Sequence, residues 1–546
     1  MIDLTNSIEW ELLAEHQRSL SGTHLQELFG NDPQRGNALS VESGELYLDL
    51  SKQILTEETL DLLVKFAERA ELAIHIEKMF TGEVVNPSEG RPALHTALRS
   101  SNNSSIEVNG VKISELIDSA FDDCTEIVRR LHSSEWLGAT GEAITTVVNL
   151  GIGGADLGPS MALNALRPYM QTAINCRFVS NVDPVSLQDQ LSDITPATTL
   201  FIINSKSFST QETLSNAGVA RNWLQKKLGT GKEVIEKHVL AVTGNKQGAK
   251  EFGLPNENIL PIWDWVGGRY SICSPASLIL QIGIGVENFR MMLDGFSEID
   301  DHFRSANFRN NIPVLMALVG MWNRNFLGFN SLAVIPYAKA LAQFPGYLQQ
   351  LEMESNGKSV HLDGTDVEHE TSPIVWGGVG TDSQHSFFQF LHQGTTITPV
   401  DFIAFCNPVK PLPKSSEADQ QDQLLANCFA QAQALAMGSN KGGINEISNE
   451  SISSIRNADG NRPSTTILAN TLSPYSLGQL IGLYEHKVFV QGVLWQINSF
   501  DQWGVEYGKA LAESIIPNLV QSTPSLPTVD SSTDSLIAQY HRWRKR

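Results

Sequence analysis

Two loops of the sequence carry residue types that can hold a phosphate group. The first, GIGGADLGP at 151–159, follows a short apolar run at 145–150. Its glycines let the backbone turn sharply and approach a ligand closely, and Pro159 suits the first turn of a helix. A helix that begins there directs free N–H groups at an anion. Taken alone, the loop fits a phosphate site with Gly154 at the ligand and a structural turn equally well.

The glycine pattern differs from two common nucleotide-binding motifs. Asp156 stands where the dinucleotide fingerprint GxGxxG needs its last glycine. The pair Gly231-Lys232 is followed by Glu233, where a Walker A loop needs Ser or Thr. The sequence therefore contains neither motif at these positions.

The second loop, SKSFSTQET at 205–213, follows the apolar run at 199–204. Ser209 and Glu212 have the spacing of a capping box, which predicts that a helix begins here. One interpretation is that Ser209 only caps the helix and that its neighbours are solvated. Five hydroxyls and a lysine between a strand and a helix suit a phosphate monoester better. We therefore predict a phosphate-binding loop that uses Ser205, Lys206, Ser207 and Thr210.

These loops need a scaffold of buried strands, and short apolar runs supply it. The runs alternate with helical stretches, a pattern that predicts a parallel sheet covered on both faces. The series starts again near Ser331, so we predict two α/β domains in tandem. Helices are predicted across most of 1–140, with clear periodicity at 57–76 and 112–131, and again at 277–327 and 468–519. The predicted strands are 145–150, 176–180, 199–204, 239–242, 331–336, 374–376 and 402–405.

Length, charge and cysteine usage limit the class of protein. A chain of 546 residues is too long for one hydrophobic core, so two or three domains are expected. Its 39 Lys and Arg against 60 Asp and Glu give a formal charge of −21, which argues against nucleic acid or an acidic membrane as partner. Five scattered cysteines fit a reducing compartment. Without a signal peptide or an apolar span of membrane length, a cytoplasmic protein is expected.

The two loops and five further segments resemble one family, the glucose-6-phosphate isomerases. The resemblance implies an α/β fold of two flavodoxin-like sugar-isomerase domains, 116–290 and 291–505. A helical N-terminal segment, 1–115, precedes them and a helical arm, 506–546, follows. A homodimer without cofactor or metal is also implied. The five segments are 89–99 (EGRPALHTALR), 263–271 (WDWVGGRYS), 349–358 (QQLEMESNGK), 380–395 (GTDSQHSFFQFLHQGT) and 478–509 (GQLIGLYEHKVFVQGVLWQINSFDQWGVEYGK).

The resemblance implies the interconversion of glucose 6-phosphate and fructose 6-phosphate, by ring opening and proton transfer between C2 and C1 through a cis-enediol. One base has to take a proton and return it to the neighbouring carbon, and a carboxylate suits that task. Glu354 matches the family's base, although its spacing alone would also fit a solvated surface charge. Arg269 matches the cation that stabilises the developing negative charge. An ion pair between Arg269 and Asp264 is the alternative.

The remaining site residues also come from the resemblance. His385 and Lys509 match the pair that opens the ring, with His385 supplied across the dimer interface. Gln349 and Gln502 match substrate-binding positions. From the residues alone, His385 also fits a structural histidine, and Gln502 and Lys509 fit a solvated stripe two turns long if 501–513 is helical. A few such cations would attract a phosphate dianion within an acidic protein.

The sequence departs from the family pattern in both phosphate loops. Ala155 stands where the family has a serine, and Ser207 and Ser209 stand where it has threonines. The two serines keep their hydroxyls, whereas Ala155 removes one. We expect weaker sugar-phosphate binding from Ala155 and no loss of activity. The basic end, 542–546, is interpreted as a solvated tail.

Two other functions were compatible with parts of the sequence. A regulatory sugar-phosphate sensor would need the phosphate loops but not Glu354, His385 and Lys509 together. An isomerase that also accepts mannose 6-phosphate stays open, since both sugars offer the same C1–C2 chemistry. A metal-dependent isomerase is not expected, because no cluster of His and Glu has the spacing of metal ligands.

Overall fold

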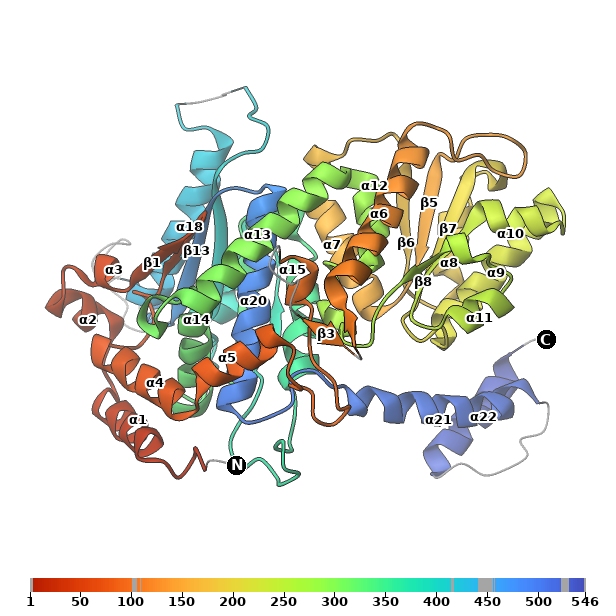
Figure 1. Ribbon diagram of the computed structural model, residues 1–546. Helices are drawn as coiled ribbons and strands as arrows, with labels where there is room; N and C mark the ends of the chain where they lie inside the picture. The colour runs from red at the N-terminus through yellow and green to blue at the C-terminus, as the bar shows by residue number, and fades with distance from the viewer. Residues whose placement is uncertain are drawn as a thin grey trace. The chain divides into compact units, whose positions relative to one another are not determined.

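The computed structural model describes residues 3–100, 106–108, 110–413, 417–439, 455, 457–521 and 530–544. The chain divides into two compact units, Met1–Ser499 and Phe500–Arg546. The first unit contains two larger β-sheets, each with helices packed against it (Figure 1). These sheets account for every strand that the sequence predicted.

The five-stranded sheet is entirely parallel, in the order β6-β5-β7-β8-β9. Numbered along the chain this is 2-1-3-4-5, the flavodoxin-like order. Four of its strands were predicted, and only β9, three residues long, was missed because so short a run carries no periodic signal. The strands are β5 (Thr146–Leu150), β6 (Asn175–Val179), β7 (Thr199–Asn204), β8 (Val239–Thr243) and β9 (Ile259–Pro261).

Both faces of this sheet are buried, as the apolar runs predicted. Val147 and Val148 are both fully buried but belong to different hydrophobic clusters, because successive strand residues point to opposite faces. One cluster packs against α6 and α12, and the other against helices that include α9 and α10 (Figure 1). The helices around the sheet are α6 (Ile113–His132), α7 (Leu157–Ala165), α8 (Pro184–Leu191), α9 (Gln211–Leu228), α10 (Lys232–His238), α11 (Lys246–Glu251) and α12 (Leu278–Ile284).

The six-stranded sheet has the order β1-β2-β13-β12-β10-β11. Strands β10 to β13 are parallel, whereas β2 joins β13 in the antiparallel direction, with Leu48 opposite Ile467. The N-terminal segment therefore contributes two strands to the second sheet. The strands are β1 (Ser40–Ser43), β2 (Leu46–Asp49), β10 (Ser331–Pro336), β11 (Ile374–Gly377), β12 (Val400–Asn407) and β13 (Ser464–Thr471).

Two segments that were predicted to be mainly helical also contribute strands to this sheet. The N-terminal segment is not purely helical, because β1 and β2 lie within it, and the predicted helical stretch at 468–519 begins with the second half of β13. β2 buries only Leu46 and Leu48 on alternate positions, too short a pattern to stand out in the sequence. A smaller two-stranded sheet joins β3 (Glu107–Val108) to β4 (Val111–Lys112).

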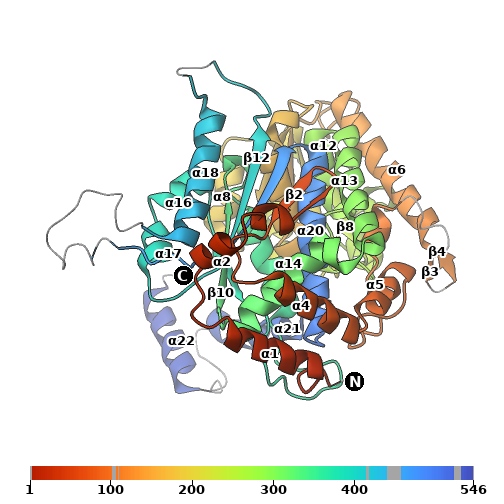
Figure 2. The ribbon, with the colours of Figure 1, turned by 90° about the vertical axis from the view of Figure 1, so that its left-hand side faces the viewer.

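Helices cover the second sheet as well. α17 and α18 pack on one face, over a cluster that contains Phe388, Phe402 and Cys428 (Figure 2). α20 is buried along nearly all of its length and packs against α13 and α14. The α-helices described around this sheet are α13 (Val286–Ser305), α14 (Ile312–Met321), α15 (Phe344–Leu348), α16 (Gly380–Gln384), α17 (Phe388–Gln393), α18 (Gln420–Met437) and α20 (Pro474–Leu494).

The N-terminal helical prediction at 57–76 is confirmed in type but not as one helix. Glu71 has φ +53°, a left-handed conformation that ends one helix and starts the next. The prediction at 112–131 is confirmed as α6. The N-terminal helices are α1 (Ile8–Ser19), α2 (Leu25–Asn31), α3 (Arg35–Ala38), α4 (Glu57–Arg69) and α5 (Leu72–Thr81).

The second unit contains α21 (Trp503–Val520) and α22 (Ser531–Trp543). The predicted basic tail begins inside α22, and Lys545 and Arg546 lie outside the described residues. Within the described part of the chain, no helix is both long and apolar enough to cross a membrane. The boundaries predicted at 115, 290 and 505 stay predictions.

Candidate active site

The two predicted phosphate loops follow neighbouring strands of the first sheet. β5 pairs with β7, and from this pair the sheet extends to β6 on one side and to β8 on the other. Such a point, where the strand order reverses, opens a crevice at the carboxyl ends of the strands. The loops after β5 and β7 therefore meet at the position where α/β sheets of this kind bind ligands.

The glycine loop is held from below by two asparagines at the ends of these strands. Asn149 Nδ2 donates to the carbonyl oxygen of Ala155 at 3.0 Å, and Asn204 Nδ2 donates to the same oxygen at 3.3 Å. Gly154 passes so close to Gly268 that a Cβ on it would lie 1.9 Å from the Gly268 carbonyl oxygen. Only glycine fits there, and the contact brings the loop against the segment that carries Arg269.

The hydroxyl loop leads into α9, which begins at Gln211 with Thr210 at its N-cap. The capping box predicted from Ser209 is wrong, because Ser209 Oγ donates instead to Ser207 Oγ at 2.7 Å. Ser205 Oγ donates to Thr210 Oγ1 at 3.2 Å. Among the described residues no side chain caps α9, so the N–H groups of its first turn remain available to bind an anion.

Lys206 joins this loop to the arginine segment. Its Nζ donates to the carbonyl oxygens of Asp264 and Val266, at 3.0 and 2.9 Å. Burial lowers the pKa of Lys206, and the nearby Asp264 carboxylate opposes that shift. The ion pair observed for Arg269 is with Glu354 and not with Asp264, the alternative considered; Asp264 Oδ1 lies 3.9 Å from Arg91 Nη1.

Arg269 and Glu354 form the charged centre of the site. Arg269 Nη1 lies 3.4 Å from Glu354 Oε2. The buried guanidinium also donates from Nε to Ser355 Oγ at 2.6 Å and from Nη2 to the Ser499 carbonyl oxygen at 2.7 Å. The Glu354 side chain keeps 16% of its surface exposed. A fixed cation therefore faces a carboxylate that a ligand can still reach.

Glu354 ends a π-helical turn, Gln349–Glu354, in which Gln350, and not the predicted site residue Gln349, contacts the carboxylate; the role of Gln349 stays a prediction. Gln349 is exposed, whereas Gln350 Nε2 donates to Glu354 Oε2 at 3.0 Å. A Cβ on Gly153 would lie 3.0 Å from the same nitrogen, so Gln350 lies between the glycine loop and the carboxylate. The i, i+4 spacing of Gln350 and Glu354 was the signal in the sequence that pointed to Gln350.

Asp156 is an acid of the glycine loop that the sequence did not single out as a site residue. It is buried at the start of α7, and its Oδ1 has no hydrogen-bond partner among the described residues. Burial raises the pKa of Asp156 to about 6, against the opposing effect of a hydrogen bond with Ser180. The loop therefore holds a carboxyl group that changes charge close to neutral pH.

His385 follows α16 and is exposed. Its imidazole makes no hydrogen bond or ion pair to the residues that the structure describes. Lys509 and Gln502 belong to the second unit, where Lys509 Nζ donates to Glu506 at 2.7 Å. Gln502 is the N-cap of α21, so the condition for a face shared with Lys509, a helix over 501–513, is met only from Trp503 onward. The roles of these three residues stay predictions.

Comparison with known proteins gives one consistent result. The profile of the family described as phosphoglucose isomerase matches residues 49–537. A glucose-6-phosphate isomerase of Frankia casuarinae is 50% identical over 543 residues, which cover 98% of this chain and 97% of the relative. One of Deinococcus radiodurans is 47% identical over 549 residues, and the match covers 100% of both chains.

A solved structure agrees. The crystal structure of a glucose-6-phosphate isomerase from Chlamydia trachomatis matches with a TM-score of 0.87 and 32% identity, covering 99% of this chain and 100% of that one. The α/β fold, with parallel strands in both larger sheets, and the resemblance seen in the sequence are thereby confirmed. This chain belongs to the phosphoglucose isomerase family.

Proposed function

We propose that this protein, an aldose–ketose isomerase by its family, uses Glu354 to move a proton between C2 and C1 of glucose 6-phosphate and fructose 6-phosphate. The observation that carries the proposal is the contact of Glu354 with Arg269 and Gln350, directly beside the glycine loop. A carboxylate in this place can take the C2 proton and return it to C1. The enediolate formed between the two transfers is stabilised by the fixed guanidinium.

The phosphate is assigned to the two loops of the first sheet. The N–H groups that begin α9, together with the hydroxyls of Ser205, Ser207 and Thr210, supply donors for its oxygens. The Lys206 ammonium uses two of its three N–H groups in hydrogen bonds to carbonyl oxygens, and its positive charge remains at the site. Gly154 gives the ligand access to the backbone. Gln350 takes the place that the sequence had assigned to Gln349.

The experiment that tests the base is the substitution Glu354→Gln. Turnover in a coupled assay with glucose 6-phosphate, run with a chelator present, should disappear, while binding of a sugar phosphate by calorimetry is retained. Retained turnover would contradict the assignment of Glu354. Loss of both turnover and binding would instead favour a structural role. The expectation that no metal or cofactor takes part stays a prediction that the chelator control addresses.

Ring opening is assigned to His385 and Lys509, within a homodimer in which His385 reaches the partner's site. Two features support this part of the proposal. His385 is exposed and unpaired among the described residues, and α21 exposes Trp503, Tyr507 and Leu511, a stripe of large apolar side chains at helical spacing. Exposed apolar stripes of this kind are typical of interfaces between subunits.

Mixing two inactive variants tests the shared site. Glu354→Gln and His385→Ala are each expected to be inactive as homodimers. If His385 acts across the interface, a heterodimer contains one site with both defects and one intact site. After random re-association, about a quarter of the wild-type sites should therefore be active. No recovered activity, with heterodimers demonstrated by mass spectrometry, would contradict the shared site.

Other parts of the assignment are proposals of the same kind. The division into 1–115, 116–290, 291–505 and 506–546 is supported by the strands, since each of the two middle segments contains the parallel strands of one sheet. A cytoplasmic location is supported by five cysteines that are all free thiols. The sensor alternative is disfavoured, because phosphate binding alone does not require a buried arginine beside Glu354.

A further inference from the structure

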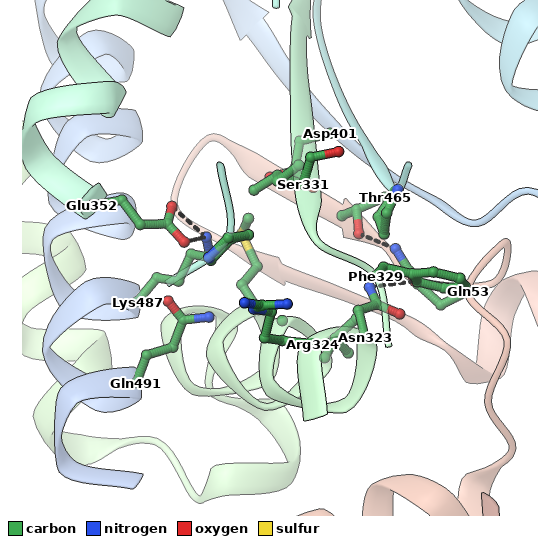
Figure 3. Close-up of a pocket in the computed structure, with 16 residues that line it drawn as sticks. Gln53, Asn323, Arg324, Phe329, Ser331, Glu352, Asp401, Thr465, Lys487 and Gln491 are labelled. Atoms are coloured by element: carbon green, nitrogen blue, oxygen red, sulfur yellow. Dashed lines mark hydrogen bonds and ion pairs between the residues drawn. The ribbon is translucent and has the colours of Figure 1, made fainter. Parts of the chain in front are cut away.

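The π-helical turn that carries Glu354 has a second acid on its other side. Residues two apart in a helix do not face each other, so Glu352 points away from the site when Glu354 points into it. The Glu352 side chain is 1% exposed and that of its partner Lys487 is 3% exposed. Lys487 Nζ donates to both carboxylate oxygens, at 2.9 Å to Oε1 and 2.8 Å to Oε2. Figure 3 shows this pair at the edge of a small pocket.

Lys487 is itself firmly held. It lies in the middle of α20, one of the most thoroughly buried helices of the described chain, between α13 and α14. The ring of Tyr484, one turn earlier, lies 5.6 Å from the Lys487 ammonium, and Tyr484 Oη donates to Asp401 Oδ2 at 3.0 Å. The position of the Lys487 ammonium is therefore fixed by its surroundings, and the position of the Glu352 carboxylate is set by its hydrogen bonds to that ammonium.

Stability alone does not explain such a pair. Removing two charges from water costs several kcal/mol per ion, and replacing a buried ion pair by apolar residues of similar size is often neutral or stabilising. A π-helical turn is uncommon in proteins but frequent at functional sites. The directions of its side chains depend on how the turn is oriented about the helix axis, and specific contacts can fix that orientation. Two hydrogen bonds from one fixed ammonium supply such a contact, because they fix both the position and the orientation of Glu352.

We infer that the Lys487–Glu352 ion pair is a positioning device for Glu354. It fixes the rotation of the π-helical turn, so that the carboxylate two residues later stays against Arg269 and Gln350. Lys358 fixes the end of the same turn, since its Nζ donates to the carbonyl oxygens of Glu354 and Ser355 at 3.2 and 2.8 Å. Glu352 and Lys487 touch no reacting atom in this scheme and act through Glu354 alone.

The test is a double variant that removes both charges, Glu352→Leu with Lys487→Met. Since an apolar pair of similar volume packs well, the melting temperature should stay equal or rise. A displaced base slows proton transfer, so kcat should fall roughly 10- to 100-fold while KM stays within about twofold. The isotope effect on kcat with substrate deuterated at C2 should also increase, because proton transfer then limits the rate.

A matched control comes from the same pocket. Gln491 is fully buried, lies one turn after Lys487, and neither of its amide atoms has a partner among the described residues. Gln491→Met should therefore leave kcat and the isotope effect unchanged. If the double variant does not fold, the same kinetic measurements are made on Glu352→Gln, which keeps the size of the side chain.

Two outcomes overturn the inference. One is a folded double variant, or Glu352→Gln, with kcat within twofold of the parent. The other is a fall in kcat with an unchanged isotope effect at C2. The inference rests on Glu354 as the base, and the two failures are distinguishable: turnover by Glu354→Gln contradicts the base itself, whereas turnover by the double variant contradicts only its positioning.

Discussion

The loops behind β5 and β7 and the cluster around Glu354 are built in different ways. Each loop is a local strand–loop–helix unit, whose donors are backbone N–H groups and, in the loop after β7, short hydroxyl side chains. The cluster instead unites side chains from distant segments, with Arg269 between Glu354, Ser355 and the Ser499 carbonyl oxygen. In the proposed assignment, phosphate binding therefore depends on backbone geometry, whereas proton transfer depends on tertiary packing.

The two regions should therefore differ in the kinetic constant that their substitutions change. Substitutions in the loops should act mainly on KM, because a phosphate is held equally in the ground and transition states. Substitutions in the cluster should act mainly on kcat, because its charges matter most when the enediolate forms.

Arg269→Lys should have the largest effect. The lysine keeps the charge but cannot reach Glu354, Ser355 and the Ser499 carbonyl oxygen together, as the forked guanidinium does. We expect kcat to fall about 100- to 1000-fold, the cost of losing one preorganised donor, with a small change in KM. Steady-state kinetics measures both constants. A decrease in kcat of less than tenfold would break the proposed division between the two regions.

Lys206→Met tests the binding side. Losing one charge-assisted contact to the phosphate should raise KM roughly 10- to 100-fold, since such bonds contribute about 1.5–3 kcal/mol, while kcat changes little. The control is Lys232→Met, which removes an equal charge from a side chain that is 80% exposed. If Lys206→Met lowered kcat more than it raised KM, its ties to Asp264 and Val266 would matter more for Arg269 than for the phosphate.

Asp156→Asn tests whether the buried Asp156 carboxylate of the glycine loop lowers the free energy of unfolding. The raised pKa means that between about pH 4 and pH 6 the folded protein keeps a proton that the unfolded chain has released. The free energy of unfolding should therefore fall through this window as the pH rises, and remain lower above it. We expect Asp156→Asn to be more stable than the parent by up to about 3 kcal/mol at pH 8, with little difference at pH 4. Urea denaturation at the two pH values measures this; an equal effect at both would contradict it.

Gln350→Leu and Gln349→Leu test which of the two glutamines belongs to the cluster around Glu354. Gln350 donates to the Glu354 carboxylate and Gln349 is exposed. The first substitution should lower kcat roughly tenfold, the worth of about one hydrogen bond to a charged group. The second should change neither kcat nor KM measurably. The reverse result would restore Gln349 as the site residue.

Ala155→Ser should have the smallest measurable effect. A serine in the glycine loop can add one hydrogen bond to the substrate, worth about 0.5–1.5 kcal/mol with a neutral partner. KM should therefore decrease a few-fold with kcat unchanged. An unchanged KM would mean that Ala155 does not weaken substrate binding in this protein.

The sequence alone determined the features that depend on neighbouring residues. Apolar runs bounded by glycine or hydroxyl loops were enough to predict β5, β7 and β10, because a strand buried on both faces has to be continuously apolar. The same local logic predicted that the loops after β5 and β7 bind phosphate, and that role stays a prediction. It failed where an element is short, as in β2 and β9, or where a side chain takes a different local partner, as Ser209 does with Ser207.

Only the tertiary structure decided which charged groups meet. Glu352 and Glu354 are two similar acids in the sequence, and family resemblance was needed to select Glu354. In the structure Glu352 is buried against Lys487 and Glu354 faces Arg269, because a π-helical turn directs them to opposite sides. Likewise, nothing in the sequence indicated that the first strands of the chain would complete the second sheet. Such pairings join residues from 85 to more than 400 positions apart, and their energies depend on burial and geometry that exist only in the folded chain.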